Sequence, residues 1–141
     1  KTIEQPASPA GGFSNDTMVL VPIPLYKSKF KKRGYNQSEL LAQGLSRKLN
    51  ISMVNILERV KNTPSQVGLE RKKRIENISG AFSVASNVSQ YLLARLAAKR
   101  AGRQVFLIDD VLTTGSTLLE AANVLKRKGI KRVWGIALAR D

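Results

Sequence analysis

Two neighbouring carboxylates and a loop rich in hydroxyl groups are the part of this sequence best suited to chemistry. The apolar run 105–108 precedes Asp109 and Asp110, and the loop 113–117 follows, with Gly115 in its middle. A parallel sheet binds ligands beyond the carboxyl ends of its strands, and the N-terminus of a following helix offers unpaired N–H groups to an anion. A glycine lets the backbone approach a ligand closely and adopt a positive φ. The order therefore predicts a phosphate site. The hydroxyl groups of the loop belong to Thr113, Thr114, Ser116 and Thr117.

The two carboxylates need a different partner, because a carboxylate repels a phosphate. Asp109 and Asp110 are expected to accept hydrogen bonds from sugar hydroxyls or to contact a hydrated Mg²⁺. The run is not a P-loop, since no Gly-Lys-Ser/Thr follows it, and it is not a Rossmann fingerprint, since it contains one glycine. The alternative interpretation is a strand-turn-helix segment whose Thr and Ser side chains only cap the helix.

The composition restricts the chemistry available to the chain. It has no cysteine and no histidine, which excludes disulfides, thiol nucleophiles and the commonest general base. Any reaction must use carboxylates, cations, hydroxyls, the backbone or a bound ion. No apolar run approaches the roughly 20 residues that cross a bilayer, and no signal-peptide pattern opens the chain, so no membrane span and a cytoplasmic location are expected.

The segment Ile108–Thr117 resembles the signature with which type I phosphoribosyltransferases bind phosphoribosyl pyrophosphate (PRPP). The resemblance implies that Asp109 and Asp110 hold the ribose hydroxyls of PRPP or of ribose 5-phosphate, and that residues 113–117 hold the 5′-phosphate. It implies Mg²⁺ as a cofactor that arrives with PRPP and contacts Asp109 or Asp110, with no dedicated metal site. The implied reaction transfers the phosphoribosyl group to an unknown acceptor and releases pyrophosphate.

Further segments resemble the ComF family, phosphoribosyltransferase-like proteins linked to DNA uptake in competent bacteria, over about residues 18–140. They are Val21–Leu25, Arg33–Gln37 with Leu40–Ala42, Arg59, Thr63, Gln66, Arg71, Asn77 and Gly80–Phe82. Two features depart from the family. The sequence has no cysteines for the four-cysteine zinc segment that ComF proteins commonly carry, and the stretch 86–104 is longer than the usual connector.

The resemblance assigns roles to two basic segments. The first follows the first expected strand, where type I phosphoribosyltransferases place their pyrophosphate loop; it contains Arg33, Gly34, Asn36 and Gln37. The second, 59–77, corresponds by order to the flexible loop that closes over PRPP, with Arg71 in a catalytic role and Lys73 as a second pyrophosphate clamp. The alternatives are a helix-capping turn for the first segment and a solvated insertion for the second.

The formal net charge of +14 points to anionic partners. Basic residues gather at 27–33, at 71–74 and at 126–132. Such clusters favour nucleic acid, because neutralising phosphates releases counterions. Together with the resemblance to ComF proteins, this charge leaves an alternative function open, a non-catalytic competence factor that binds single-stranded DNA or a helicase partner.

Strand and helix patterns alternate along the chain, which predicts an α/β domain of the type I phosphoribosyltransferase-like class, with a mainly parallel sheet flanked by helices. The domain is expected over 17–141, after a flexible tail at 1–16. Trp134 and Phe106 are expected in the core. Strands are expected at 18–24, 53–60, 82–84, 105–108 and 132–139, helices at 37–49, 89–100 and 117–128, and loops after Pro24 and at 61–79.

Overall fold

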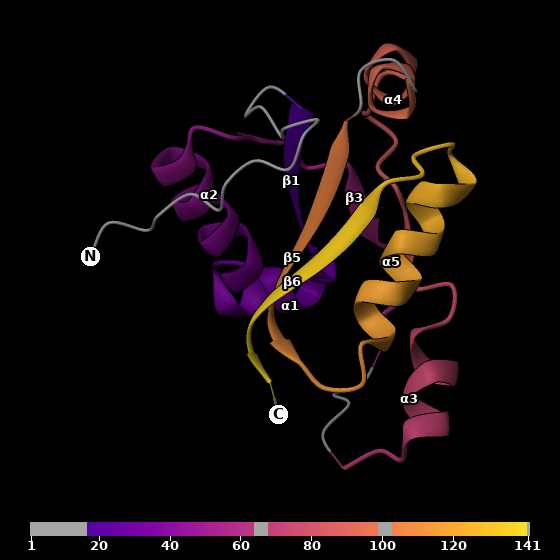
Figure 1. The fold of residues 1–141 in the computed structure, drawn as a ribbon. Helices are drawn as coiled ribbons and strands as arrows, with labels where there is room; N and C mark the ends of the chain where they lie inside the picture. The colour runs from indigo at the N-terminus through magenta and orange to yellow at the C-terminus, as the bar shows by residue number, and fades with distance from the viewer. Residues whose placement is uncertain (1–16, 64–67, 99–102, 141) are drawn as a thin grey trace.

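A four-stranded parallel sheet lies at the centre of the computed structural model, which describes residues 17–63, 68–98 and 103–140 (Figure 1). The strand order is β2-β1-β5-β6, and β3 and β4 form a separate antiparallel pair. The expected α/β architecture is confirmed, whereas the expected tail at 1–16 lies outside the described residues. The elements are β1 (Met18–Pro22), α1 (Lys27–Arg33), α2 (Gln37–Leu49), β2 (Ser52–Met53), β3 (Leu57–Arg59), α3 (Arg71–Ile78), β4 (Phe82–Val84), α4 (Gln90–Ala97), β5 (Gln104–Leu112), α5 (Ser116–Arg127) and β6 (Val133–Arg140).

The sheet changes its direction of winding between β1 and β5. The crossover from β1 through α2 leads outward to β2, whereas the crossover from β5 through α5 leads outward the other way, to β6. Right-handed crossovers then place α2 and α5 on opposite faces, as Figure 1 shows. The Ile23 N–H donates to the Ile108 carbonyl at 2.9 Å, just beyond the end of β1 at Pro22. The carboxyl ends of β1 and β5 thus form the switch point at which open α/β sheets bind ligands.

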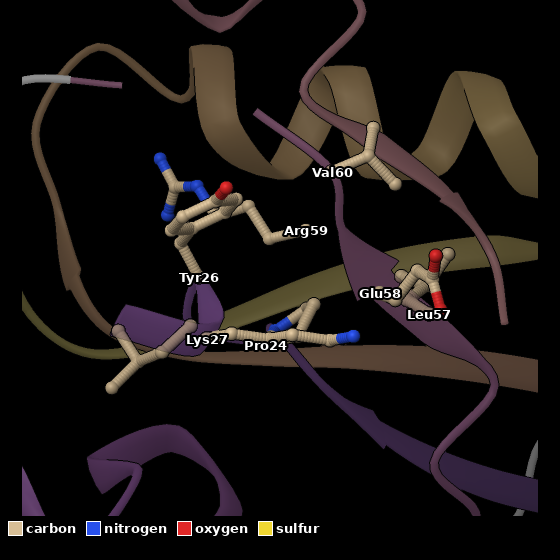
Figure 2. Close-up of a pocket in the computed structure, with 8 residues that line it drawn as sticks. Pro24, Tyr26, Lys27, Leu57, Glu58, Arg59 and Val60 are labelled. Atoms are coloured by element: carbon tan, nitrogen blue, oxygen red, sulfur yellow. The ribbon is translucent and has the colours of Figure 1, made fainter. Parts of the chain in front are cut away.

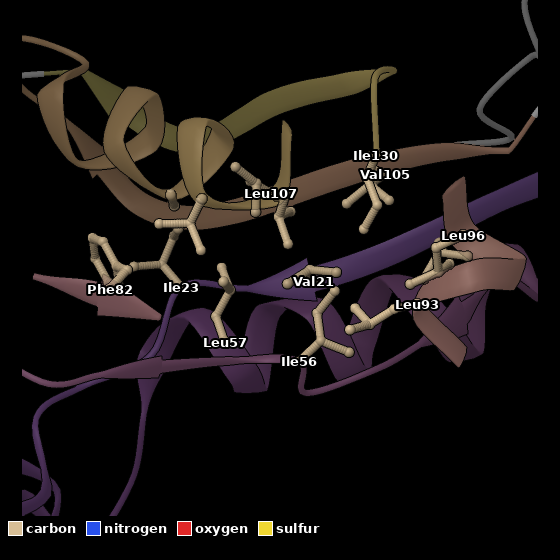
Figure 3. Close-up of a cluster of buried hydrophobic side chains, with 14 of the residues drawn as sticks. Val21, Ile23, Ile56, Leu57, Phe82, Leu93, Leu96, Val105, Leu107 and Ile130 are labelled. Atoms are coloured by element: carbon tan, nitrogen blue, oxygen red, sulfur yellow. The ribbon is translucent and has the colours of Figure 1, made fainter. Parts of the chain in front are cut away.

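Alternate residues of β1 and β5 fill two apolar clusters, one on each face of the sheet. Val21 and Leu107 belong to the larger cluster, which includes side chains of α4, α5, β3 and β4 (Figure 3). Leu20 and Ile108 point to the other face, where they pack with residues of α2 such as Ala42. This alternation is the period-2 pattern of strands covered on both faces.

The chain after Pro24 forms a helix, so the expectation of a basic loop there is wrong. Helix α1 begins after Tyr26 and ends at Gly34, which has φ 83° and donates its N–H to the Phe30 carbonyl at 2.7 Å. Only one apolar residue, Phe30, interrupts the polar run, and no residue of α1 is buried. The periodic apolar pattern that reveals a surface helix is therefore missing from this segment.

The run 53–60 divides between two sheets instead of forming one strand as expected. The Val54 N–H still donates to the Leu20 carbonyl of β1 at 2.9 Å. Two residues later the Ile56 carbonyl accepts from the Ala85 N–H at 2.9 Å, next to β4. Strand propensity along an apolar run does not specify its pairing partner, which tertiary packing decides.

The segment 61–79 contains helix α3, so the expectation of one long loop is also wrong. The helix packs against α5, and its Ile78 is buried in the larger apolar cluster. The Gly80 N–H next to it donates to the Glu120 carboxylate at 3.2 Å. Most of the α3 surface faces water, so its sequence is mostly polar. The buried contact through Ile78 is too short to produce the apolar period that predicts a helix.

Strand β5 continues to Leu112, beyond the expected end at Ile108. It does so because β6 still pairs with it there: Asp109 lies opposite Ala137 and Val111 opposite Ala139. The expected strand 82–84 and the helix after Asn36 are confirmed, and α5 and β6 begin or end within one residue of their expected bounds. Helix α4 ends at Ala97, and the last residues of the expected helix 89–100 lie outside the described ones.

The two aromatic residues expected in the core differ in burial. Phe106 is partly buried against the α2 cluster, whereas Trp134 on β6 is exposed. Within the described part of the chain, every helix is too short or too polar to cross a bilayer.

Candidate functional site

Asp109 lies at the switch point, one residue after the last β1–β5 hydrogen bond. Its Oδ1 accepts from the Ser38 hydroxyl at 3.1 Å and from the Asp110 N–H at 2.9 Å. Ser38 is buried in the first turn of α2. Helix α2, through its N-terminal turn, therefore fixes the carboxylate that the sequence singled out, from a position 71 residues earlier in the chain.

Burial raises the pKa of Asp109 to about 6, and the adjacent Asp110 carboxyl adds to this rise, while the Ser38 hydroxyl opposes it. A carboxylate taken out of water is less stable in its charged form. At neutral pH the ionised Asp109 side chain therefore lowers the stability of the folded protein. Such strained ionisable groups concentrate at functional sites.

The loop after β5 enters helix α5 through a glycine in the left-handed region. Gly115 has φ 81° and caps the N-terminus of α5, where its carbonyl accepts from the Leu119 N–H at 2.9 Å. The Thr114 hydroxyl lies 2.9 Å from the Ser116 hydroxyl and also accepts from the Ser116 N–H at 3.3 Å. Only glycine adopts such a φ without strain. The loop that joins β5 to α5, and the start of α5, lie at the carboxyl end of β5 (Figure 1).

The first basic segment, Arg33–Gln37, contains a buried residue that holds two elements together and other residues that are exposed or partly exposed. Asn36 is buried: its amide donates to the Ile23 carbonyl at 2.9 Å and its Oδ1 accepts from the Ser38 N–H at 3.1 Å. Asn36 therefore ties α2 to the end of β1 and orients Ser38. Gly34 ends α1, Arg33 is exposed in its last turn and Gln37 begins α2.

The sequence analysis did not assign Arg59 to the site, although Arg59 is one of the residues that resemble the ComF family. Arg59 ends β3, its guanidinium lies 5.3 Å from the centre of the Phe82 ring, and its Nη2 donates to the Thr63 hydroxyl at 2.7 Å. Burial lowers the pKa of Arg59, and the charge of Asp109 acts against that shift. A charged residue within the apolar run 56–60 was the signal that could have marked it.

Lys29 of α1 and Arg59 both donate hydrogen bonds to Thr63. The Lys29 ammonium donates to the Thr63 carbonyl at 2.7 Å. Burial lowers the pKa of Lys29, and the positive charges of Arg59 and Arg33 lower it further. Thr63 is almost fully buried between the two cations. The resulting group, which we call the cation cluster, consists of Lys29, Arg33 and Arg59 beside Asp109.

Arg71 and Lys73 lie on α3 and are exposed. The contacts described for the chain join neither of them to Asp109 or to the cation cluster. Helix α3 does pack on α5, the helix that begins at the hydroxyl-rich loop. The clamp role implied for Arg71 and Lys73 therefore stays a prediction.

A cavity of about 430 Å³ opens beside Arg59. The segment after β1, which includes Tyr26, forms one wall, and β3 forms the other. Figure 2 shows the Arg59 side chain reaching toward Tyr26, while the Glu58 carboxylate points away from both. The lining residues are Pro24, Leu25, Tyr26, Lys27, Leu57, Glu58, Arg59 and Val60.

Comparison with known protein families gives a match to the phosphoribosyl transferase domain over residues 36–141, which covers Asn36, Asp109 and the whole loop 113–117. The chain belongs to this family. Its phosphoribosyl transferase domain also resembles curated proteins of the competence and DNA-utilization group, which confirms the ComF-family assignment. The match begins after β1 and α1, so it does not include Lys29.

Three relatives illustrate the ComF-type group. The Haemophilus influenzae competence protein F is 43% identical over 123 residues, which are 85% of this chain and 50% of that protein. The Escherichia coli K12 DNA utilization protein YhgH is 35% identical over 122 residues, 86% of this chain and 48% of that protein. The Bacillus subtilis competence protein ComFC is 34% identical over 113 residues, 79% of this chain and 39% of that protein. The chain thus spans half or less of each relative.

Proposed function

We propose that this phosphoribosyl transferase domain binds PRPP at the switch point of its sheet. One observation carries the proposal: a half-buried carboxylate, Asp109, lies on the strand β5, which leads through the positive-φ glycine Gly115 into helix α5. Asp109 and Asp110 accept hydrogen bonds from the ribose hydroxyls, and the loop 113–117 with the N-terminus of α5 holds the 5′-phosphate.

The pyrophosphate group belongs beside the cation cluster. Burial lowers the pKa of Lys29, and the positive charges of Arg59 and Arg33 lower it further, so a bound anion would offset that repulsion. Arginine suits phosphate oxygens because its guanidinium donates two parallel hydrogen bonds. This assignment gives Arg59 a role that the sequence-based interpretation gave to Arg71.

Mg²⁺ fits this site as part of the substrate. The ion prefers oxygen ligands and commonly uses one or two carboxylates together with substrate phosphates and water. Asp109 and Asp110 supply two carboxylates, and the described residues contain no group of three or more His, Cys, Asp or Glu side chains, so phosphate oxygens and water would complete the coordination. When bound, the ion would neutralise charge on the pyrophosphate.

A catalytic reading follows from the same groups. The bond between the anomeric carbon and the pyrophosphate oxygen breaks, the cation cluster stabilises the charge on the leaving pyrophosphate, and the acceptor forms the new bond to carbon. Asp109 and the phosphate loop hold the sugar in place during this exchange. The cavity beside Arg59 offers room for an acceptor next to the leaving group.

Calorimetric titration with PRPP and Mg²⁺ tests the proposal. The wild-type chain should bind, and Gly115→Ala should bind at least about tenfold more weakly, because an L side chain at this φ costs about 1–2 kcal/mol and distorts the turn. Gly80→Ala is the matched control, since Gly80 has φ 71° and open space around it but lies outside the phosphate loop. No binding by the wild-type chain, or equal losses in both variants, would refute the PRPP site.

A second function, binding of single-stranded DNA, is favoured by the names of the relatives and by the exposed cations of α1 and α3. We propose that DNA phosphates contact Lys31 and Lys32 at the same end of the sheet. Charge reversal of these two should weaken DNA binding more than charge reversal of Lys128 and Lys131 at the C-terminus of α5. Saturating PRPP should weaken DNA binding, and DNA should weaken PRPP binding by the same factor. Equal losses from both pairs and no effect of PRPP would leave only nonspecific attraction.

A further inference from the structure

Three large apolar side chains lie exposed in a row on strand β6. Trp134 is 56% exposed, Ile136 42% and Leu138 72%. They occupy alternate positions, so they project from the same face of the sheet. We call this row the β6 stripe. Scattered apolar residues on a surface are ordinary, whereas a contiguous row of three marks a contact surface.

The strand register identifies the face to which the β6 stripe belongs. Trp134 lies opposite Phe106 and Ile136 lies opposite Ile108. Phe106 and Ile108 face α2, and Ile108 is buried there. The β6 stripe therefore continues the apolar surface that α2 covers over β1 and β5. The opposite face of β6 is occupied, because Leu118 of α5 packs so closely on Gly135 that an added Cβ would lie 2.9 Å from it.

The winding of the sheet explains why this area is bare. Helix α2 belongs to the β1–β2 crossover and lies over that half of the sheet, while α5 belongs to the β5–β6 crossover and lies on the opposite face. Neither crossover supplies a helix over the α2-side face of β6. Parallel sheets are normally covered on both faces, so an additional element is needed to complete the layer.

We propose that the β6 stripe docks an amphipathic helix belonging to chain outside these 141 residues, in a part that corresponds to the unmatched half of the longer relatives. The Haemophilus and E. coli proteins extend about as far again beyond the region matched here. The helix packs an apolar row on Trp134, Ile136 and Leu138 and completes the layer begun by α2. The region 1–16 is a poor source, since its 16 residues include two prolines and two adjacent glycines.

The charges around the β6 stripe define the helix further and disfavour a second copy of this chain. Arg132 precedes β6 and Arg140 ends it, so acidic residues at the two ends of the docked helix complement them. An antiparallel pairing of two β6 strands about Ile136 would set Arg132 of one copy against Arg140 of the other. It would also join two chains that each carry a net charge of +14.

Trp134 is the only tryptophan of the chain, so its fluorescence reports on this face alone. The probe is the part of the Haemophilus competence protein F outside the matched region, produced together with the 141-residue chain so that each can fold in the presence of the other. A 1:1 complex should form, with a blue-shifted tryptophan emission and a several-fold drop in quenching by acrylamide. The 141-residue chain by itself should show a red-shifted, readily quenched emission.

Two leucine variants provide the specificity control. Leu138→Asp should abolish the complex and the blue shift. Leu119→Asp should leave both unchanged, because Leu119 is 61% exposed but lies on α5 on the other side of the sheet. Circular dichroism confirms that both variants are folded. Failure to recover the pair, a complex insensitive to Leu138→Asp, or a Leu138-dependent dimer of the chain alone would overturn the proposal.

Discussion

The crevice at the switch point and the surface of helix α3 carry comparable numbers of charges in opposite surroundings. In the crevice, Asp109 and Arg59 are partly buried, and their pKa values are shifted by burial. On α3, Arg71, Lys72 and Lys73 are exposed to water. A charge in water costs nothing to maintain, whereas a charge removed from water must be compensated. Under the proposed function, the partly buried cations Lys29 and Arg59 hold the ligand, although the charges of α3 are denser along the sequence.

The largest expected effect comes from the buried carboxylate. The pKa of Asp109 in the folded protein, about 6, lies above its value of 3.8 in an unfolded chain. Ionising Asp109 therefore costs the folded state stability as the pH rises from about 4, and the loss is complete above the folded-state pKa. Asp109→Asn should raise the free energy of unfolding at pH 8 by up to about 3 kcal/mol and leave it unchanged below pH ~4, while PRPP binding is lost. Urea unfolding at the two pH values measures this. An equal shift at both would contradict the assigned cause.

The second prediction compares the contribution of the cation cluster to pyrophosphate binding with that of helix α3. Arg59→Met keeps most of the apolar contact with Phe82 but removes the charge. It should weaken the binding of pyrophosphate with Mg²⁺ by about 10- to 100-fold, the usual range for a hydrogen bond to a charged group. Arg71→Met, the matched change on α3, should cost less than about threefold, because an exposed charge contributes little. Calorimetry with both variants decides between them, and a larger loss from Arg71→Met would restore its predicted clamp role.

A smaller effect is expected within helix α1. Lys29→Gln should weaken pyrophosphate binding by about three- to tenfold, since Lys29 donates to the Thr63 carbonyl and lies close to Arg59. Lys31→Gln removes the same charge from an exposed position of the same helix and should have almost no effect on this ligand. The ratio of the two dissociation constants is the quantity to compare. Equal values would mean that α1 acts only through its net charge.

The smallest effect on PRPP is expected from the exposed surface of α3. Replacing Arg71, Lys72 and Lys73 by glutamine should leave PRPP affinity within about twofold. If these residues contact DNA phosphates, the same change should lower the slope of the logarithm of single-stranded DNA affinity against the logarithm of salt concentration by up to about 2, since each contact contributes about 0.7. Titrations at three salt concentrations measure the slope. An unchanged slope would show that α3 does not contact the DNA.

Several elements could be predicted because their information is local. The helix after Asn36 and the strand 82–84 have caps or apolar periods within a few residues, and both were confirmed. The basic helix α1 and helix α3 were missed because few of their residues are apolar, so neither leaves a clear periodic pattern. The strand that contains Trp134 was predicted correctly, but its burial was not, because Trp134 is exposed. Which face of a strand is covered depends on how the helices pack on the sheet.

The sequence by itself determined the α/β class, the family and the order of carboxylates and hydroxyls from Asp109 to Thr117, since all of these depend on residues adjacent in the chain. Only the tertiary structure decided that Ser38 and Arg59, which precede Asp109 by 71 and 50 residues, stand beside it, and that Arg71 stays in water. The physical reason is that burial and electrostatic coupling arise from parallel strands brought together by long crossovers, and such distances through space are not encoded in any local pattern.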